Sequence, residues 1–158
     1  MKHPDIDRHV ENISTWLANF GYTLNCTVES LPNGQVGSYE SGSVFEKEIQ
    51  IYVSTNNIRT FIEEMNLPQN EYDTQCGLTV YHEVGHALME QLIDWSENID
   101  EMEELLDGYY GKKYFDIFND DNKTEEQIVE EFAEGMYSTD GSLLQSCFEE
   151  TDKKLSNS

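Results

Sequence analysis

The sequence predicts a single α+β domain in which a small twisted β-sheet packs on a long helix, with another helix following it. The length of 158 residues is typical of one domain with its own core. Apolar residues alternate along 44–54, as in a half-buried strand, and recur at three- and four-residue steps before and after it, as in helices. We expect the domain to span residues 1–150 and residues 151–158 to form a flexible tail.

The first expected element is a helix over residues 5–20. Its apolar residues lie at helical spacing, with a glycine as the stop signal: Ile6, Val10, Ile13, Leu17, Phe20 and Gly21. Residues 22–30 are rich in β-branched and aromatic side chains, which predicts a strand. The turn signal Leu-Pro-Asn-Gly at 31–34 predicts that a hairpin or meander begins there.

The strand over residues 44–54 is followed by a capped helix. Ser54 or Thr55 is the expected cap, and the helix ends before Pro68. We expect its apolar residues to share one face: Ile58, Phe61, Ile62 and Met65.

Two later helices carry the residues of functional interest. The first runs over residues 73–95, and the second begins with a capping box, in which Thr124 precedes Gln127 by three residues, and continues to Tyr137. Residues 96–123 between them are expected to form a variable insert or lid. A short closing helix is expected over residues 143–148.

The charge of the chain excludes several classes of partner. Its 32 acidic and 9 basic residues give a formal charge of −23, which repels phosphate backbones and anionic lipid headgroups. We therefore expect no nucleic-acid or membrane partner, and a preference for basic substrates would fit this charge. No segment resembles a signal peptide or a membrane span, which predicts a cytoplasmic protein, and we expect a monomer.

The motif that carries chemistry is His-Glu-Val-Gly-His at residues 82–86. On a helix, positions four apart lie one above the other, so His82 and His86 can direct their imidazoles at one zinc ion. Glu83 lies one step round the helix, where its carboxylate can act as a general base on a water at that metal.

Catalytic zinc usually has three protein ligands, so a further ligand is required. The helix over 124–137 carries several glutamates, and Glu130 and Glu134 share a face one turn apart. One can bind the metal while the other orients a histidine through its second nitrogen. Glu131 is the remaining alternative for the ligand.

These motifs resemble a known family. The segment HEVGHALM, together with EEFAE at residues 130–134 and the MYSTD that follows, resembles the zincin metallopeptidases of the gluzincin type. It is most similar to the group of the anthrax lethal factor catalytic domain and the Pro-Pro endopeptidases. The resemblance implies a zincin fold and a Zn²⁺ cofactor, with His82, His86 and Glu130 as ligands. It further implies that Glu83 is the base and that Glu134 supports a ligand from behind.

The sequence departs from the family at one position. Its members place a tyrosine that stabilises the oxyanion about two turns before the third ligand, where this chain has Lys123. Either Lys123 takes that role as a cation, or a nearby tyrosine does, or the role is missing. The candidate tyrosines are Tyr109, Tyr110, Tyr114 and Tyr137.

The function expected from these observations is a zinc-dependent endopeptidase acting on a protein or peptide. We expect residues 49–53 to form an edge strand beside the cleft, able to hold an extended substrate by β-addition. Two alternatives remain open. One is an acidic, non-enzymatic binding or inhibitor protein that mimics DNA, and the other is a catalytically inactive zincin-fold module.

Overall fold

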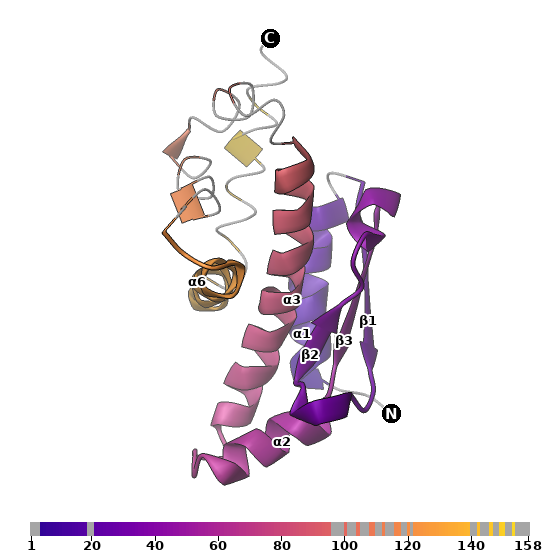
Figure 1. Cartoon of the computed structure of the whole chain (residues 1–158), viewed down its shortest axis with the longest axis vertical. Coiled ribbons are helices and arrows are strands. Elements are labelled where there is room, and N and C mark those ends of the chain that lie inside the picture. The colour runs from indigo at the N-terminus through magenta and orange to yellow at the C-terminus, as the bar shows by residue number, and fades with distance from the viewer. Residues whose placement is uncertain are drawn as a thin grey trace.

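The computed structural model of this chain describes residues 4–18, 21–95, 100, 104, 108, 109, 112, 116, 117, 120, 122–139, 142, 146, 149, 150 and 153. In chain order these residues form α1 (Pro4–Ala18), β1 (Thr23–Val28), β2 (Gly37–Tyr39), β3 (Glu48–Val53), α2 (Thr55–Glu64), α3 (Glu71–Trp95) and α6 (Glu125–Ser138). Short 3₁₀ turns, η1 (Pro32–Gly34) and η2 (Ser43–Glu46), precede and follow β2. The described part is thus a mixed α+β domain with four helices and a three-stranded sheet (Figure 1).

The order of the strands in the sheet is β1-β3-β2, which corrects two expectations. β1 pairs with β3 in parallel, so the turn after β1 does not make a hairpin, and only β2 and β3 are antiparallel neighbours. β3, which contains the expected edge strand 49–53, is the central strand and has both edges paired. The alternation of apolar residues showed which face of β3 is buried, but it holds no information on how many neighbours the strand has.

One face of the sheet packs on helices. Ile49, Ile51 and Val53 of β3 are fully buried, and the residues between them point to the more open face. Figure 1 shows α3 and α1 beside the sheet, with β2 the strand next to α3. This arrangement places the edge strand β2 along the helix that carries both motif histidines.

The helix α2 begins where the sequence predicts, because the Ser54 side chain accepts a hydrogen bond from Asn57 N at 3.2 Å. Ile58 and Ile62 are buried. Phe61 and Met65 were expected on the same face, but they are 38% and 60% exposed. Only Ile58 and Ile62, which are four residues apart, contact the core, because α2 packs against one end of α3 through a narrow face.

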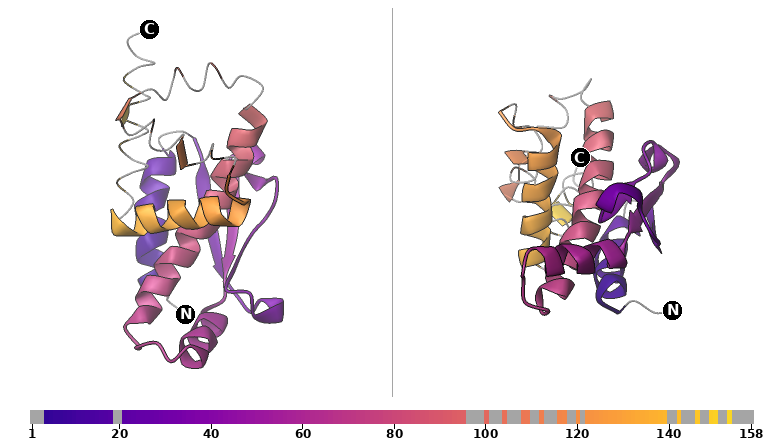
Figure 2. Two further views of the ribbon diagram at one scale, coloured as in Figure 1. Left: turned by 60° about the vertical axis from the view of Figure 1, so that its left-hand side comes forward. Right: turned by 60° about the horizontal axis from the view of Figure 1, so that its bottom comes forward.

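The helix α6 lies across α3 on the side away from the sheet (Figure 2). Its buried face is formed by Ile128, Val129, Phe132, Ala133 and Met136. The contact is close at Gly85, where a Cβ atom would lie 3.0 Å from Phe132 Cδ1 and 3.2 Å from Val129 Cβ. The absence of a side chain at Gly85 therefore lets α6 approach the histidine-bearing stretch of α3.

Several expectations fall outside the described residues. They concern most of the insert 96–123, with Tyr110 and Tyr114, the closing helix over 143–148, and most of the tail 151–158. Among the residues that are described, no helix is both long and apolar enough to cross a membrane.

Candidate metal centre

The two motif histidines face one another on α3. His82 and His86 lie one helical turn apart, and their Nε2 atoms are 3.2 Å apart. Their neighbours Tyr81, Val84 and Ala87 are fully buried, so the packing of α3 fixes the side on which the histidines emerge. Both rings are mostly buried and reach the surface at a cleft between α3, β2 and α6.

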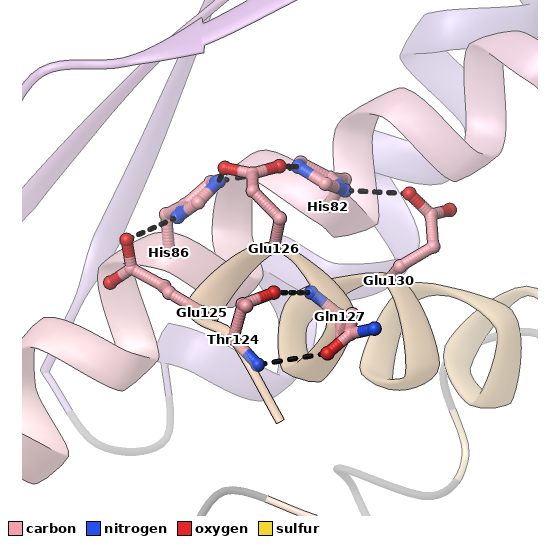
Figure 3. Close-up of polar contacts among 7 residues, drawn as sticks. All are labelled: His82, His86, Thr124, Glu125, Glu126, Gln127 and Glu130. Atoms are coloured by element: carbon pink, nitrogen blue, oxygen red, sulfur yellow. Dashed lines mark hydrogen bonds and ion pairs between the residues drawn. The ribbon is translucent and has the colours of Figure 1, made fainter. Parts of the chain in front are cut away.

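A carboxylate from α6 bridges the two rings. Glu126 places Oε2 at 3.1 Å from Nε2 of His82 and Oε1 at 3.1 Å from Nε2 of His86, as Figure 3 shows. These three side chains form the group of potential metal ligands found among the described residues.

Two further carboxylates of α6 lie behind the rings. Glu130 Oε2 is 3.1 Å from Nδ1 of His82, and Glu125 Oε2 is 3.6 Å from Nδ1 of His86 (Figure 3). Since a carboxylate accepts hydrogen bonds, the contact with Glu130 favours the tautomer in which Nδ1 of His82 carries the proton. The lone pair of Nε2 is then directed toward His86 and Glu126.

The donor set fits zinc. A tetrahedral ion with bonds of roughly 2.0–2.1 Å separates its ligand atoms by about 3.3 Å. The two Nε2 atoms are 3.2 Å apart, and Glu126 offers a different oxygen to each of them, Oε2 to His82 and Oε1 to His86, both at 3.1 Å. With one ligand atom taken from each residue, the three atoms lie within 4.8 Å of one another, so a small adjustment of the Glu126 side chain would bring them to these separations. Two imidazoles with one carboxylate are also a ligand set of catalytic zinc sites, and carboxylates on the outer imidazole nitrogens are the usual support.

Glu83 lies beside this group and is 7% exposed. The pKa of its carboxyl is raised to about 7, chiefly by burial; the nearby His82 acts to lower it, and Glu126 and Glu130 act to raise it. A carboxyl with such a pKa can both accept and return a proton near neutral pH, which is what a general acid–base group requires.

The cleft extends to both sides of the histidines along β2. One part, of about 370 Å³, is lined by the metal-ligand group and by neutral residues such as Gln35, Leu78 and Thr79. The other part, of about 470 Å³, continues past His86 toward Tyr39, Ser41, Glu90 and Glu125. Glu83 and Gly37 line both parts.

The glutamates of α6 that were predicted as the third ligand or its support do not take the expected positions. Glu130, expected as the third ligand, contacts the outer nitrogen of His82, the place assigned by resemblance to Glu134. Glu134 is exposed and does not line the cleft. Glu131 forms an ion pair with Lys123.

The structure describes three of the residues predicted as possible oxyanion stabilisers, and none of the three lies at the cleft. Lys123 binds Glu131 and lies 3.7 Å from Asp120 Oδ2. Tyr137 donates a hydrogen bond to Thr74 at 3.1 Å, and Tyr109 is largely exposed. None of them lines either part of the cleft.

Sequence reasoning missed Glu126 as a ligand candidate. It lies one turn before Glu130 on the same face of the helix, so spacing alone could not choose between the two. The choice is made where Val129 and Phe132 pack against Gly85, which brings the first turn of α6 opposite the histidines. The capping box was the sequence signal that pointed to Glu126, because it predicts that the first turn of this helix is well ordered. In the structure, the Thr124 side chain accepts a hydrogen bond from Gln127 N at 3.2 Å, and Gln127 Oε1 accepts one from Thr124 N at 2.9 Å.

Comparison of the chain with protein-family models, with curated proteins and with solved structures found no match.

Proposed function

We propose that this protein is a zinc-dependent endopeptidase. The observation that carries the proposal is the convergence of one ligand atom each from His82, His86 and Glu126 to within 4.8 Å of one another, with the buried carboxyl of Glu83 beside them. The resemblance of HEVGH to the zincin motif supports the same function from the sequence.

In this proposal His82, His86 and Glu126 hold the ion, while Glu130 and Glu125 orient the rings. Zinc in such a site supplies Lewis acidity, which activates a water and polarises the scissile carbonyl. Glu83 takes the proton from the attacking water and delivers it to the leaving amine, so that one amide bond breaks and one carboxylate and one amine form.

The edge strand β2 is the proposed substrate-binding strand, in place of 49–53. Val36 O accepts from Ser54 N at 2.8 Å and Glu40 N donates to Gln50 O at 2.9 Å, so these residues face β3. In an antiparallel ladder the intervening residues alternate, which turns the backbone groups of Gly37 and Tyr39 away from β3. An extended peptide could pair with them and pass the metal with chain on both sides, which favours internal cleavage.

The decisive experiment combines metal analysis with a cleavage assay. We expect the purified protein, after incubation with zinc and removal of excess, to hold about one zinc per chain, and the H82A variant to hold none. We expect the parent to cleave members of a mixed-sequence library of internally quenched peptides, and the E83Q variant to retain zinc without cleaving. Absence of zinc from the parent would refute the proposal. Stoichiometric zinc without cleavage would favour an inactive zinc-binding module, which the engagement of Lys123 with Glu131 also suits.

A further inference from the structure

We propose that Gly37 is the positioning residue for the carboxylate of Glu83. This inference rests on the proposed function, because it concerns the base of that reaction. A Cβ atom at position 37 would lie 2.9 Å from Glu83 Oε2 and 3.0 Å from Glu83 Cγ. These distances are shorter than ordinary carbon contacts of about 3.5–4.0 Å, so the bare backbone of β2 is already the wall against which the Glu83 side chain rests.

Steric contact, and not hydrogen bonding, holds Glu83 in place. The side chain is 7% exposed, yet no hydrogen bond or ion pair joins it to another residue of the described chain. The wall is fixed by the sheet, because Val36, before Gly37, accepts a hydrogen bond from Ser54 N, and Ser38, after it, pairs with Tyr52 of the central strand. The wall therefore cannot recoil without breaking the ladder between β2 and β3.

A side chain at position 37 would also clash with a second residue, Thr79. This second contact allows an effect on stability to be distinguished from an effect on function. A Cβ at 37 would also lie 2.6 Å from Thr79 Cγ2. Thr79 is held by its own hydrogen bond, Oγ1 to Gln75 O at 2.7 Å, so its methyl group cannot rotate away without losing that bond. The contact with Thr79 bears on the fit of β2 to α3, whereas the contact with Glu83 bears on the base.

The experiment compares G37A with a matched control. Gly77 is on the same helix as Glu83 but outside the cleft, and a Cβ there would meet His9 Nε2 and Tyr137 Cε2, each at 2.7 Å, a clash as severe as that at Gly37. We expect G37A to keep its zinc and to lose about 100-fold in kcat on the peptide that the parent cleaves fastest, with a smaller change in KM, because a displacement of about 1 Å has that effect. G77A should lose stability and keep the parental kcat.

The double variant G37A/T79S tests whether the role is merely structural. Serine keeps the hydrogen bond to Gln75 and removes the methyl group nearest the new Cβ, so the double variant should regain melting temperature over G37A. Its kcat should stay about 100-fold below that of the T79S single variant, because the clash with Glu83 persists. Recovery of kcat together with stability, or a G37A variant as active as the parent, would overturn the proposal.

A crystal structure of metal-free G37A/T79S makes the test independent of the proposed function. We expect the Glu83 carboxylate to be displaced from its parental position by about 1 Å. If the parent cleaves no peptide, the proposed function fails, and this structure alone decides the role of Gly37. An undisplaced carboxylate would refute the inference whether or not the protein is a peptidase.

Discussion

At the residue scale, the candidate site depends on which carboxylate meets which imidazole nitrogen. Glu126 lies at the Nε2 atoms, which face each other, and Glu130 lies at the outer nitrogen of His82. A ligand and a supporting residue differ in how much affinity their loss removes. The two glutamates can therefore be told apart by titration.

We expect E126A to lose stoichiometric zinc and E130Q to retain it with an affinity lowered by roughly 10- to 100-fold, the usual effect of removing a partner behind a ligand. Competition with a chromophoric chelator measures both. The exposed position 134 supplies the control, E134Q, which should bind like the parent. If E130Q loses its zinc while E126A keeps it, Glu130 is the ligand that the family resemblance implies.

Glu83 also makes the stability of the metal-free protein depend on pH. The pKa of its carboxyl is about 7 in the folded chain and near its ordinary value of 4.5 when unfolded. Between these values the folded state holds more protons than the unfolded state, so the free energy of unfolding falls as pH rises through the window and is level above it. The burial of a charge opposes folding there by up to about 3 kcal/mol.

We therefore expect E83Q, with chelator present, to be more stable than the parent at pH 8 by on the order of 1–3 kcal/mol, and this advantage to shrink at pH 5. Urea unfolding at the two pH values measures the difference, and E134Q controls for the loss of a carboxylate at an exposed site. An advantage that is equal at both pH values would contradict the raised pKa.

At the element scale, the first turn of α6 carries the candidate metal ligand Glu126. Glu125 and Glu126 lie in that turn and Glu130 one turn later, and the capping box between Thr124 and Gln127 is what closes the turn. Because the terminal N–H groups of a helix have no partner within it, the turn would fray without this cap. The positions of Glu125 and Glu126 therefore depend on the hydrogen bonds of the capping box.

We expect T124A to lower the free energy of unfolding by about 1 kcal/mol and the zinc affinity by about fivefold, because the ion must then order the frayed turn. Ser54 caps α2 far along the chain from the cleft residues of α6, so S54A is the matched control. It should lose similar stability and keep the parental zinc affinity, as chemical unfolding and chelator competition would measure. Equal affinities of T124A and the parent would show that the turn is held by packing alone.

At the scale of the whole molecule, a net charge of −23 on 158 residues acts against the compact state through self-repulsion. Salt screens charges separated by more than the Debye length, which is about 10 Å at 0.1 M. Folding should therefore be favoured by added salt.

We expect the melting temperature of the metal-free protein to rise by at least about 2 °C between 0.02 M and 0.5 M NaCl, the equivalent of about 1 kcal/mol for a domain of this size. Differential scanning calorimetry measures it, and KCl at the same ionic strength should have the same effect because screening does not depend on the cation. A melting temperature that is independent of salt would show that the acidic residues are too far apart to matter.

The sequence by itself determined the helices and the centre of the motif, but it predicted no strand at Gly37–Tyr39, and β3 begins only at Glu48, because residues 43–46 form a 3₁₀ turn. Periodicity predicted α1, α3 and α6 nearly to their ends, and the caps at Ser54 and Thr124 form as expected. It also determined that His82 and His86 share a side of one helix, because four residues make about one turn. These features depend on interactions within a few residues of the chain.

Only the tertiary structure decided which parts of the chain become neighbours. β3 is central and β2 is the edge, because the pairing of strands depends on distant segments and not on alternation along one of them. Glu126 replaces Glu130 at the Nε2 atoms because Val129 and Phe132 pack against Gly85 and so set the register of α6 on α3. Gly37 comes against Glu83 for the same kind of reason: a contact between residues 46 positions apart is decided by how layers pack, which local sequence does not encode.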